Sequence, residues 1–279
     1  SCIGIKAQRV RICLHDLCLS LICLLPCRIE SRIEIGRNRT SRTIADFSML
    51  KVASYNIHKA IGTDRRRNPG RVIDVLNELD ADIITLQEAD RRFGARAAAI
   101  PSLLLEQYSD YRAIPLDVQT DSMGWHGNAI LAHKSARIVA HDIFHIPYLE
   151  PRGAVMAQIE VYGLDLTIFG MHLDLSGLWR RRQAAAIVKL AQQYGQDRST
   201  ILMGDLNEWS ASGGCLNDFG RVYNLVECGR SFHSRGPIAS LDRIMHCDQL
   251  KAVMGGVHDS ASARKASDHL PVWAQFAQV

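Results

Sequence analysis

The sequence predicts an α/β fold with mixed β-sheets, and three observations support this prediction. A strand, a helix and a second strand follow one another within residues 51–88. Four strand-like segments then follow one another without a helix between residues 129 and 172. The chain of 279 residues is 47% apolar, which is enough for a large packed core. Parallel and antiparallel strand pairs are therefore expected in the same protein.

The strand–helix–strand unit predicts where two polar residues meet. An Asn-Pro pair at residues 68–69 is typical of a helix start, and apolar residues recur at helical spacing over 72–79. The apolar run 83–86 is typical of a buried strand. Because a helical crossover joins parallel strands, we expect Asn56 and Glu88, which follow the two strands, to lie at neighbouring strand ends.

The remaining elements are predicted from apolar periodicity and from helix start and stop signals. We expect a helix after Ser176 that ends near Gly195. The sequence shows no internal repeat and no interdomain linker. The other predicted segments are a helix over about 95–107 and strands over 129–133, 136–144, 154–161, 164–172, 200–203, 240–246 and 271–276.

The chain is divided by composition into an N-terminal extension, residues 1–48, and one predicted domain, residues 49–279. Residues 1–48 hold eight Lys or Arg and four Asp or Glu, so they carry the whole net charge of +4 and leave the domain neutral. A neutral domain lacks the basic surplus that drives non-specific binding to long nucleic acids, although a local phosphate-binding cleft remains compatible with it.

The extension has three open interpretations. Its apolar run at residues 17–25 follows two arginines, as in a signal peptide, but no Ala-x-Ala-like cleavage site follows. The run is also shorter than the ~20 residues that span a bilayer. It is a non-native extension with Met49 as the natural start, a targeting or membrane-surface segment, or a structured cap. We expect a cytoplasmic protein in the first case and a membrane-associated or exported one in the second.

Cysteines are concentrated in the same extension, which holds five of the eight. The three cysteines of the predicted domain are far apart in sequence and have neither the pattern of a disulfide framework nor the close spacing of a zinc site. The domain is therefore typical of a reducing compartment. The three are Cys215, Cys228 and Cys247.

Polar residues with catalytic potential lie at the ends of the predicted strands. Carboxylate and amide oxygens are the ligands that Mg²⁺ or Mn²⁺ prefers, and histidines suit proton transfer or stabilisation of developing charge. Strand ends place such groups on a rigid platform. Singly, each residue could merely cap a strand. The set comprises Asn56, Glu88, His172, Asp205, Asn207, Asp242, Asp268 and His269.

Eight short segments together resemble the endonuclease/exonuclease/phosphatase superfamily over essentially all of residues 49–279, and they occur in the order of that family. The resemblance implies a four-layer α/β sandwich with two mixed β-sheets and a site between the sheets at one end. The segments are Ser54-Tyr55-Asn56, Leu86-Gln87-Glu88, Gly127-Asn128-Ala129-Ile130-Leu131, Pro151-Arg152-Gly153, Met171-His172-Leu173, Gly204-Asp205-Leu206-Asn207, Leu241-Asp242-Arg243-Ile244 and Ser267-Asp268-His269.

The resemblance implies a metal-dependent attack of water on a phosphoester. Glu88 would be the main ligand of Mg²⁺ or Mn²⁺, with Asn56 and Asp268 nearby. Asp205 would orient and deprotonate the attacking water, or hold a second metal ion. Asn207 would contact the phosphate. In-line displacement requires such a placed water and a polarised phosphoryl group.

The same resemblance gives roles to two histidines. His269 would stabilise the transition state, with its ring fixed by Asp242. His172 would bind the phosphate from the other side. Arg152 is a candidate phosphate clamp, because a guanidinium can bind two oxygens at once, and a surface salt bridge is the alternative for this residue.

The substrate is less well defined by the sequence, because family motifs specify chemistry better than substrate. We expect a small or lipid-linked phosphodiester, with an endo- or exonuclease activity on DNA or RNA as the alternative. We expect a monomer and identify no protein partner. His58, His126 and Trp209 could line a substrate pocket or serve ordinary packing. A non-catalytic binding module and a membrane-associated interaction protein are the competing function classes.

Overall fold

The computed structural model describes residues 49–91, 97–116 and 121–278. The predicted N-terminal extension, residues 1–48, lies outside the described residues. The first of two six-stranded sheets has the strand order β11-β12-β1-β2-β4-β3. Its strands are β1 (Leu50–Asn56), β2 (Ile83–Gln87), β3 (Tyr111–Ala113), β4 (Ala129–His133), β11 (Leu250–Val257) and β12 (Val272–Gln278).

The second sheet has the strand order β5-β6-β7-β8-β10-β9. In the part of the chain that the structure describes, each sheet contains one parallel pair, β1 with β2 and β7 with β8, and its other strand pairs are antiparallel. The prediction of mixed sheets is thus confirmed. The strands are β5 (Arg137–His145), β6 (Gly153–Val161), β7 (Leu164–His172), β8 (Ser199–Asp205), β9 (Asn224–Leu225) and β10 (Asp242–His246).

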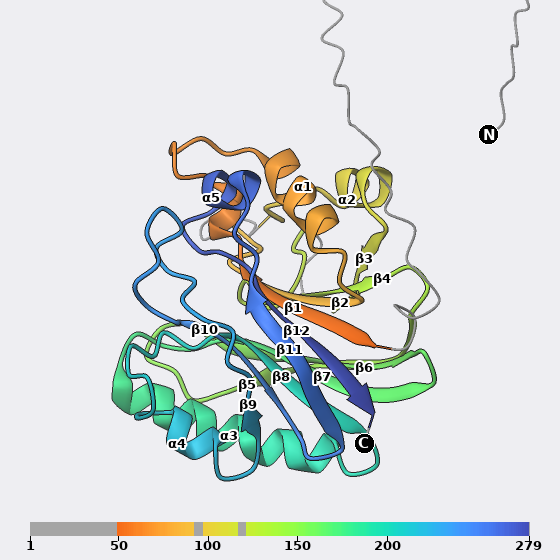
Figure 1. Cartoon of the computed structure of the whole chain (residues 1–279), viewed down its shortest axis with the longest axis vertical. Coiled ribbons are helices and arrows are strands. Elements are labelled where there is room, and N and C mark those ends of the chain that lie inside the picture. The colour runs from red at the N-terminus through yellow and green to blue at the C-terminus, as the bar shows by residue number, and fades with distance from the viewer. Residues whose placement is uncertain (1–48, 92–96, 117–120, 279) are drawn as a thin grey trace, which may run out of the picture. The chain divides into compact units, whose positions relative to one another are not determined.

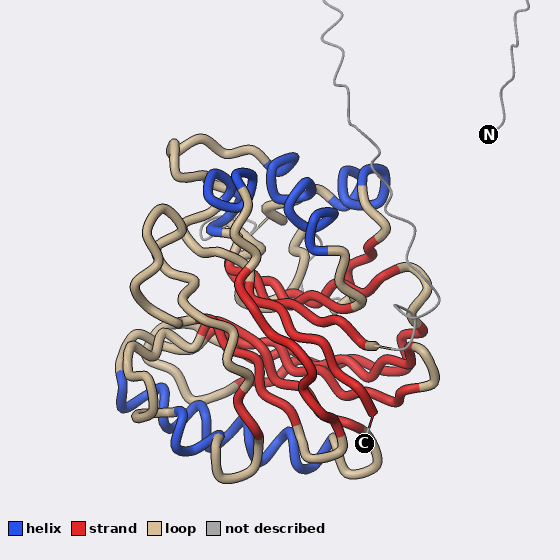
Figure 2. Tube along the Cα trace, in the orientation of Figure 1, coloured by secondary structure: helices blue, strands red, loops and turns tan. Residues whose placement is uncertain are grey.

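Helices cover the outer face of each sheet, which gives the four layers of an α/β sandwich (Figures 1 and 2). Helices α1, α2 and α5 lie over the first sheet, and α3 and α4 lie over the second (Figure 1). The helices are η2 (His58–Ala60), α1 (Pro69–Leu79), α2 (Ser102–Tyr108), α3 (Gly177–Tyr194), α4 (Leu216–Phe219) and α5 (Ala261–Ala266).

Three apolar clusters fill the spaces between these layers. Side chains such as Val52 and Ile168 pack between the two sheets. A second cluster joins the first sheet to α1, and a third joins the second sheet to α3. Alternate residues of one strand serve different clusters, since Ile201 packs between the sheets and Leu202 packs toward α3. This alternation follows from the two-residue period of a strand.

The register of the parallel pairs brings the predicted polar residues to one end of both sheets. Asn56 ends β1 opposite Gln87, the residue before Glu88. His172 ends β7 opposite Asp205, the last residue of β8. The carboxyl ends of β1, β2, β7 and β8 therefore supply the side chains of one site.

The helix expected over about 95–107 differs from the structure. Helix α2 begins at Ser102, Ala98 forms a β-bridge with Asp90, and residues 92–96 lie outside the described part of the chain. Pro101 is the N-cap of α2, with a non-helical ψ of 134°, and a proline disfavours helical geometry in the residue before it. The start predicted near Ala95 was therefore wrong.

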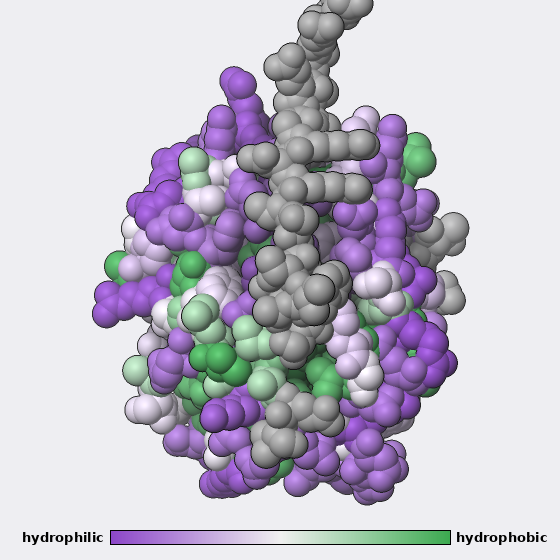
Figure 3. Space-filling model, turned by 45° about the vertical axis from the view of Figure 1, so that its right-hand side comes forward, coloured by the Kyte–Doolittle hydropathy of each residue, from purple (hydrophilic) through white to green (hydrophobic). Residues whose placement is uncertain are grey.

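The surface view in Figure 3 shows a largely hydrophilic face whose apolar side chains gather mostly in its lower half. Among the residues that the structure describes, no helix has both the length and the apolar character to cross a membrane.

Candidate active site

Asp205 lies at the centre of the predicted residues. Its carboxylate is buried, with 1% of its surface exposed. Oδ2 accepts a hydrogen bond of 3.0 Å from Nδ2 of Asn56 and lies 3.4 Å from Nε2 of His172 and 3.7 Å from Nε2 of His269. Oδ1 accepts a 2.9 Å hydrogen bond from the backbone N–H of Asn207. Both sheets thus contribute groups that surround one carboxylate.

Gly204 explains how Asp205 reaches this position. The two residues end β8, and Gly204 pairs with Met171 of the parallel strand β7. A Cβ atom on Gly204 would lie 1.9 Å from the carbonyl oxygen of Met171. Only glycine permits so close a strand contact, which sets Asp205 directly beside His172.

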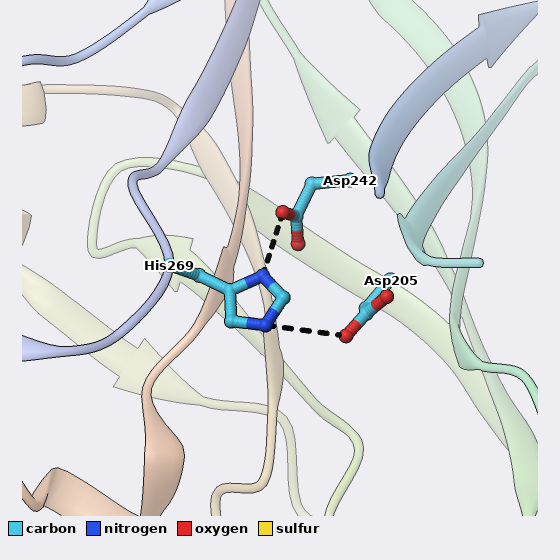
Figure 4. Close-up of side chains that lie close together, drawn as sticks. All are labelled: Asp205, Asp242 and His269. Carbon is cyan, nitrogen blue, oxygen red and sulfur yellow. Dashed lines mark hydrogen bonds and ion pairs between the residues drawn. The ribbon is translucent and has the colours of Figure 1, made fainter. Parts of the chain in front are cut away.

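His269 is held between two carboxylates (Figure 4). Its Nδ1 donates to Oδ2 of Asp242 at 2.8 Å, and Nε2 faces Asp205. Asp242 is fully buried and also accepts a hydrogen bond from Ser231. Burial lowers the pKa of His269, but Asp242 and Asp205 outweigh it and raise that pKa to about 10. The ring is therefore an imidazolium at neutral pH.

His172 has the opposite protonation state. Arg152 donates a 2.8 Å hydrogen bond to Nδ1 of His172, and because arginine has no acceptor, Nδ1 must carry no proton. Burial, reinforced by the charge of Arg152, lowers the pKa of His172 to about 3. The ring is thus neutral with its proton on Nε2, which faces Asp205. The Arg152 guanidinium also lies 3.3 Å from the carboxylate of Glu150.

Asn207 contributes mainly to the local backbone. It has a positive φ of 49°, and its Nδ2 donates to the carbonyl oxygen of Leu173 at 2.9 Å. That bond uses one of the two N–H groups of the amide. The structure therefore places Asn207 beside Asp205, with the other N–H as the group that could contact a phosphate.

Glu88 lies on the other side of the site, where it forms an ion pair with Lys59. About a quarter of its side chain is exposed, and it borders a cavity of about 270 Å³ that also includes Arg152 and His172. The cavity is therefore bordered both by the acidic Glu88 and by Arg152 and His172. Its other lining residues are Lys59, Asp90, Arg91, His126, Gly127, Glu150 and Pro151.

Asp268 is connected to Asn56 through His58. Oδ1 of Asp268 lies 3.6 Å from Nδ1 of His58, and the N–H of His58 donates to Oδ1 of Asn56 at 3.1 Å. Ser267, the neighbour of Asp268, donates to the carbonyl oxygen of Asn56 at 2.7 Å. Asp268 is thus placed beside the end of β1.

The donor set fits a hard divalent cation. Glu88, Asn56 and Asp268 offer carboxylate and amide oxygens, which Mg²⁺ and Mn²⁺ favour, and the Lys59 ammonium already places positive charge at Glu88. Asp205, Asp242 and His269 also have one ligand atom each within 4.8 Å of one another. Because Nδ1 of His269 is hydrogen-bonded to Asp242 and the ring is protonated, Asp205, Asp242 and His269 are better suited to proton transfer than to metal binding.

Residues in strained backbone conformations cluster at the site. His58, Lys59, Glu88, His126 and Asn207 all have positive φ angles between 45° and 57°. A non-glycine residue in this region costs of order 1–3 kcal/mol and is frequent in active sites. The loops after β1, β2 and β8 and the loop before β4 are therefore held in conformations that a relaxed turn would avoid.

Several neighbours of the site were not assigned a role from the sequence. Lys59, Ser231 and Phe232 contact Glu88, Asp242 and the ring of His269, respectively. Lys59 lies three residues after Asn56, and this closeness in sequence was the one feature that could have indicated a place at the site. Nδ2 of Asn128 donates to the carbonyl of Gly153 at 3.0 Å, so it joins the two loops beside Glu88.

Comparison with family models identifies this architecture. The model of the Endonuclease/Exonuclease/phosphatase family matches residues 53–269, a segment that includes every residue predicted for the site, from Asn56 to His269. Comparison with curated protein sequences gave no significant match.

Solved structures share the fold at low sequence identity. An endonuclease/exonuclease/phosphatase family protein of Bacteroides thetaiotaomicron is 20% identical, with a TM-score of 0.66 over 82% of this chain and 97% of that one. A mannosyl-6-phosphatase of the same organism is 20% identical, with a TM-score of 0.64 over 82% and 99%. TDP2 of D. rerio, solved with a single-strand DNA product, is 18% identical, with a TM-score of 0.65 over 83% and 100%.

Proposed function

The chain belongs to the Endonuclease/Exonuclease/phosphatase family, and on that premise we propose that it is a Mg²⁺- or Mn²⁺-dependent phosphodiesterase. Members of this family are metal-dependent hydrolases of phosphoester bonds. One observation carries the proposal. The buried Asp205 carboxylate lies between a neutral histidine, His172, and a charged one, His269. A general base beside donors for developing charge is what in-line hydrolysis needs.

In the proposed reaction, Asp205 accepts the proton of the attacking water. The water oxygen bonds to phosphorus while the bond from phosphorus to the leaving oxygen breaks. His269 donates to a phosphoryl oxygen as negative charge develops there, and Asp242 keeps its ring oriented and protonated. Such preorganised donors require no reorganisation at the moment of reaction.

His172 and Arg152 would bind the phosphate from the opposite side. Both line the 270 Å³ cavity, and Arg152 supplies a charge that the neutral His172 lacks. Glu88, with Asn56 and Asp268, would hold the divalent ion. When bound, that ion would supply polarisation of the phosphoryl group and stabilise the leaving oxygen.

We propose a small or lipid-linked phosphodiester as the substrate. The cavity beside Glu88 has room for a headgroup, and the neutral charge of residues 49–279 supports no extended electrostatic grip on nucleic acid. A nuclease is the second candidate, because TDP2 of D. rerio, which shares the fold, was solved with a single-strand DNA product.

The test compares substrates and metal conditions with the full chain. Bis(p-nitrophenyl) phosphate, a p-nitrophenyl phosphomonoester, supercoiled DNA and phosphatidylglycerol would each be assayed with Mg²⁺, with Mn²⁺ and with EDTA. We expect diester hydrolysis that EDTA abolishes and added metal restores. Asp205→Asn should lose activity by at least about 10³-fold while keeping the native melting temperature. Activity that survives EDTA, or wild-type turnover by Asp205→Asn, would contradict the proposal.

A further inference from the structure

Large apolar side chains that are exposed gather on the loops of the second sheet that surround the site. Six of the thirteen exposed large apolar side chains among the described residues lie in these loops or at the start of α3. Exposed apolar groups that lie together mark interaction surfaces more often than scattered ones do. We call this group the apolar rim. Its members are Tyr148, Leu149, Leu175, Leu178, Trp209 and Ile238.

Hydrogen bonds join the loops that carry the first half of the apolar rim. Oδ2 of Asp174 accepts from the backbone N–H groups of Leu149 and Glu150, both at 3.1 Å. Asp174 directly precedes Leu175 in the loop between β7 and α3. The loop after β5 and the loop after β7 are therefore neighbours, and their exposed leucines belong to one surface.

A buried ion pair joins the second half. Arg180 of α3 donates to the carbonyl of Leu175 at 2.6 Å and to Glu208 at 3.3 Å. Glu208 precedes Trp209, whose ring lies 5.9 Å from that of Phe232, and the N–H of Ile238 donates to the carbonyl oxygen of Phe232.

The apolar rim is continuous with the site through Phe232. The ring of Phe232 lies 4.9 Å from the ring of His269 and also contacts the Trp209 ring. Leu175 is three residues beyond His172. A partner that covered the apolar rim would therefore lie beside Asp205 and His269, where water is proposed to attack the phosphoester.

Positive charge accompanies the apolar rim at the start of α3. Arg181 and Arg182 follow Leu178 by three and four residues, and residues at that spacing share a helix face. Arg181 and Arg221 both pair with a single carboxylate, that of Asp218. The three arginines thus exceed this carboxylate in charge, and the surface beside the leucines favours an anionic partner.

We propose that the apolar rim docks on an anionic phospholipid surface and presents headgroup phosphoesters to Asp205. A lipid surface offers apolar contact, negative charge and a phosphoester side by side, which matches the three features of this face. Tryptophan and tyrosine favour the membrane interface because their rings are amphipathic, and leucines inserted beside arginines bind anionic bilayers. The inference rests on the proposed function for its substrate, but the docking is measurable without catalysis.

The first experiment is flotation of the full chain with vesicles of phosphatidylcholine containing about a quarter phosphatidylglycerol. We expect binding that weakens with salt and with pure phosphatidylcholine. The variant Leu175→Ser/Leu178→Ser/Trp209→Ser should bind at least about tenfold more weakly, because it removes three inserted apolar groups. The control Leu103→Ser/Val253→Ser/Met254→Ser changes exposed apolar residues elsewhere and should bind like the wild type.

The second experiment distinguishes membrane binding by the apolar rim from membrane binding by residues 1–48, which are present in all variants. Lipids with brominated acyl chains should quench the fluorescence of Trp209, and Trp209→Phe should remove most of that quenching. Equal binding by the rim and control variants together with unchanged quenching in Trp209→Phe would overturn the proposal. Self-association that disappears in the rim variant, without any vesicle effect, would also overturn it in favour of a protein interface.

The two proposals fail in different ways. If the wild type binds vesicles through the apolar rim yet hydrolyses none of the soluble or lipid phosphodiesters named above, the proposed reaction fails and the docking stands. If it hydrolyses bis(p-nitrophenyl) phosphate but the rim variants bind vesicles like the wild type, the docking fails and the reaction stands.

Discussion

Arg152 donates a hydrogen bond to Nδ1 of His172, with the two nitrogens 2.8 Å apart. This contact fixes the neutral tautomer of the histidine and keeps a permanent positive charge in the cavity beside Glu88. The two residues therefore divide the work of binding a phosphate, since the arginine provides charge and the histidine provides a directed N–H toward the centre of the site.

Arg152→Met should lower kcat/KM for a phosphodiester by about 10²-fold, because charge-assisted contacts to phosphate contribute more than neutral ones. Arg152→Lys keeps the charge without the planar fork and should recover part of the loss. Steady-state kinetics with bis(p-nitrophenyl) phosphate would measure both. Arg137→Met, which removes an exposed ion pair between Arg137 of β5 and Glu160 of β6, is the matched control and should be unaffected. Equal kinetics for Arg152→Met and the control would refute the clamp.

The pair of Asp242 and His269 predicts an alkaline limit for activity. Burial lowers the pKa of His269, while Asp242 and Asp205 raise it further than burial lowers it, to about 10. We expect activity that depends on the imidazolium to persist to about pH 10. Asp242→Asn should move the alkaline limb to lower pH, because the first charge that raises the pKa is gone. Rate profiles between pH 6 and 11 would show whether the limb moves.

The same pair contributes to stability with a definite sign. The folded pKa of His269 lies above its ordinary value of 6.5, so the folded protein binds the extra proton between these values. The stabilisation is full below about pH 6.5 and is lost as the pH rises through about 10. Thermal unfolding of wild type and Asp242→Asn should therefore differ most at about pH 6.5 and below, and converge at high pH. A difference that grows with alkalinity would contradict this assignment.

Much of the fold was predictable because its strands are apolar runs with polar ends. The boundaries of β4 and β7 match the predicted strands 129–133 and 164–172 residue for residue. Strand β11 was not predicted, because its sequence has two glycines and most of its side chains are partly exposed. Edge strands of this kind lack the alternation on which the prediction depends.

The residues of the candidate site were predicted from the order of the family motifs along the chain. The structure adds the contacts between these residues, which the order of the motifs does not reveal. Asn56 and Asp205 are 149 residues apart in sequence yet hydrogen-bonded. This contact forms because the two sheets that carry these residues face each other. The protonation states of His172 and His269 likewise depend on neighbours from other strands. The ion pair of Lys59 with Glu88 had no sequence signal beyond proximity to Asn56.

Lys59 and a divalent ion should compete for Glu88. The ammonium of Lys59 is paired with the carboxylate that is proposed to hold the metal, so the ion must displace it. Lys59→Met should strengthen Mn²⁺ binding by up to about fivefold, since partly exposed ion pairs contribute roughly 0–1 kcal/mol. Glu88→Gln should weaken the same binding. Isothermal titration calorimetry measures both without turnover, and Lys134→Met serves as a control away from the site. Weaker Mn²⁺ binding by Lys59→Met than by the wild type would contradict the competition.

Gly204→Ala should disturb stability and the site together. The added Cβ would lie 1.9 Å from the carbonyl oxygen of Met171, so β8 must shift away from β7 and carry Asp205 with it. We expect a loss of about 2–3 kcal/mol in the free energy of unfolding, as for other overpacked positions, measured by urea denaturation. Gly236→Ala is the matched control, because no atom lies within 4 Å of its added Cβ and surface changes of this kind usually stay within about 0.5 kcal/mol.

At temperatures where Gly204→Ala is still folded, its activity should also fall, because Asp205 would no longer lie at hydrogen-bonding distance from Asn56. A folded, fully active Gly204→Ala protein would show that the position of Asp205 does not depend on this close strand contact.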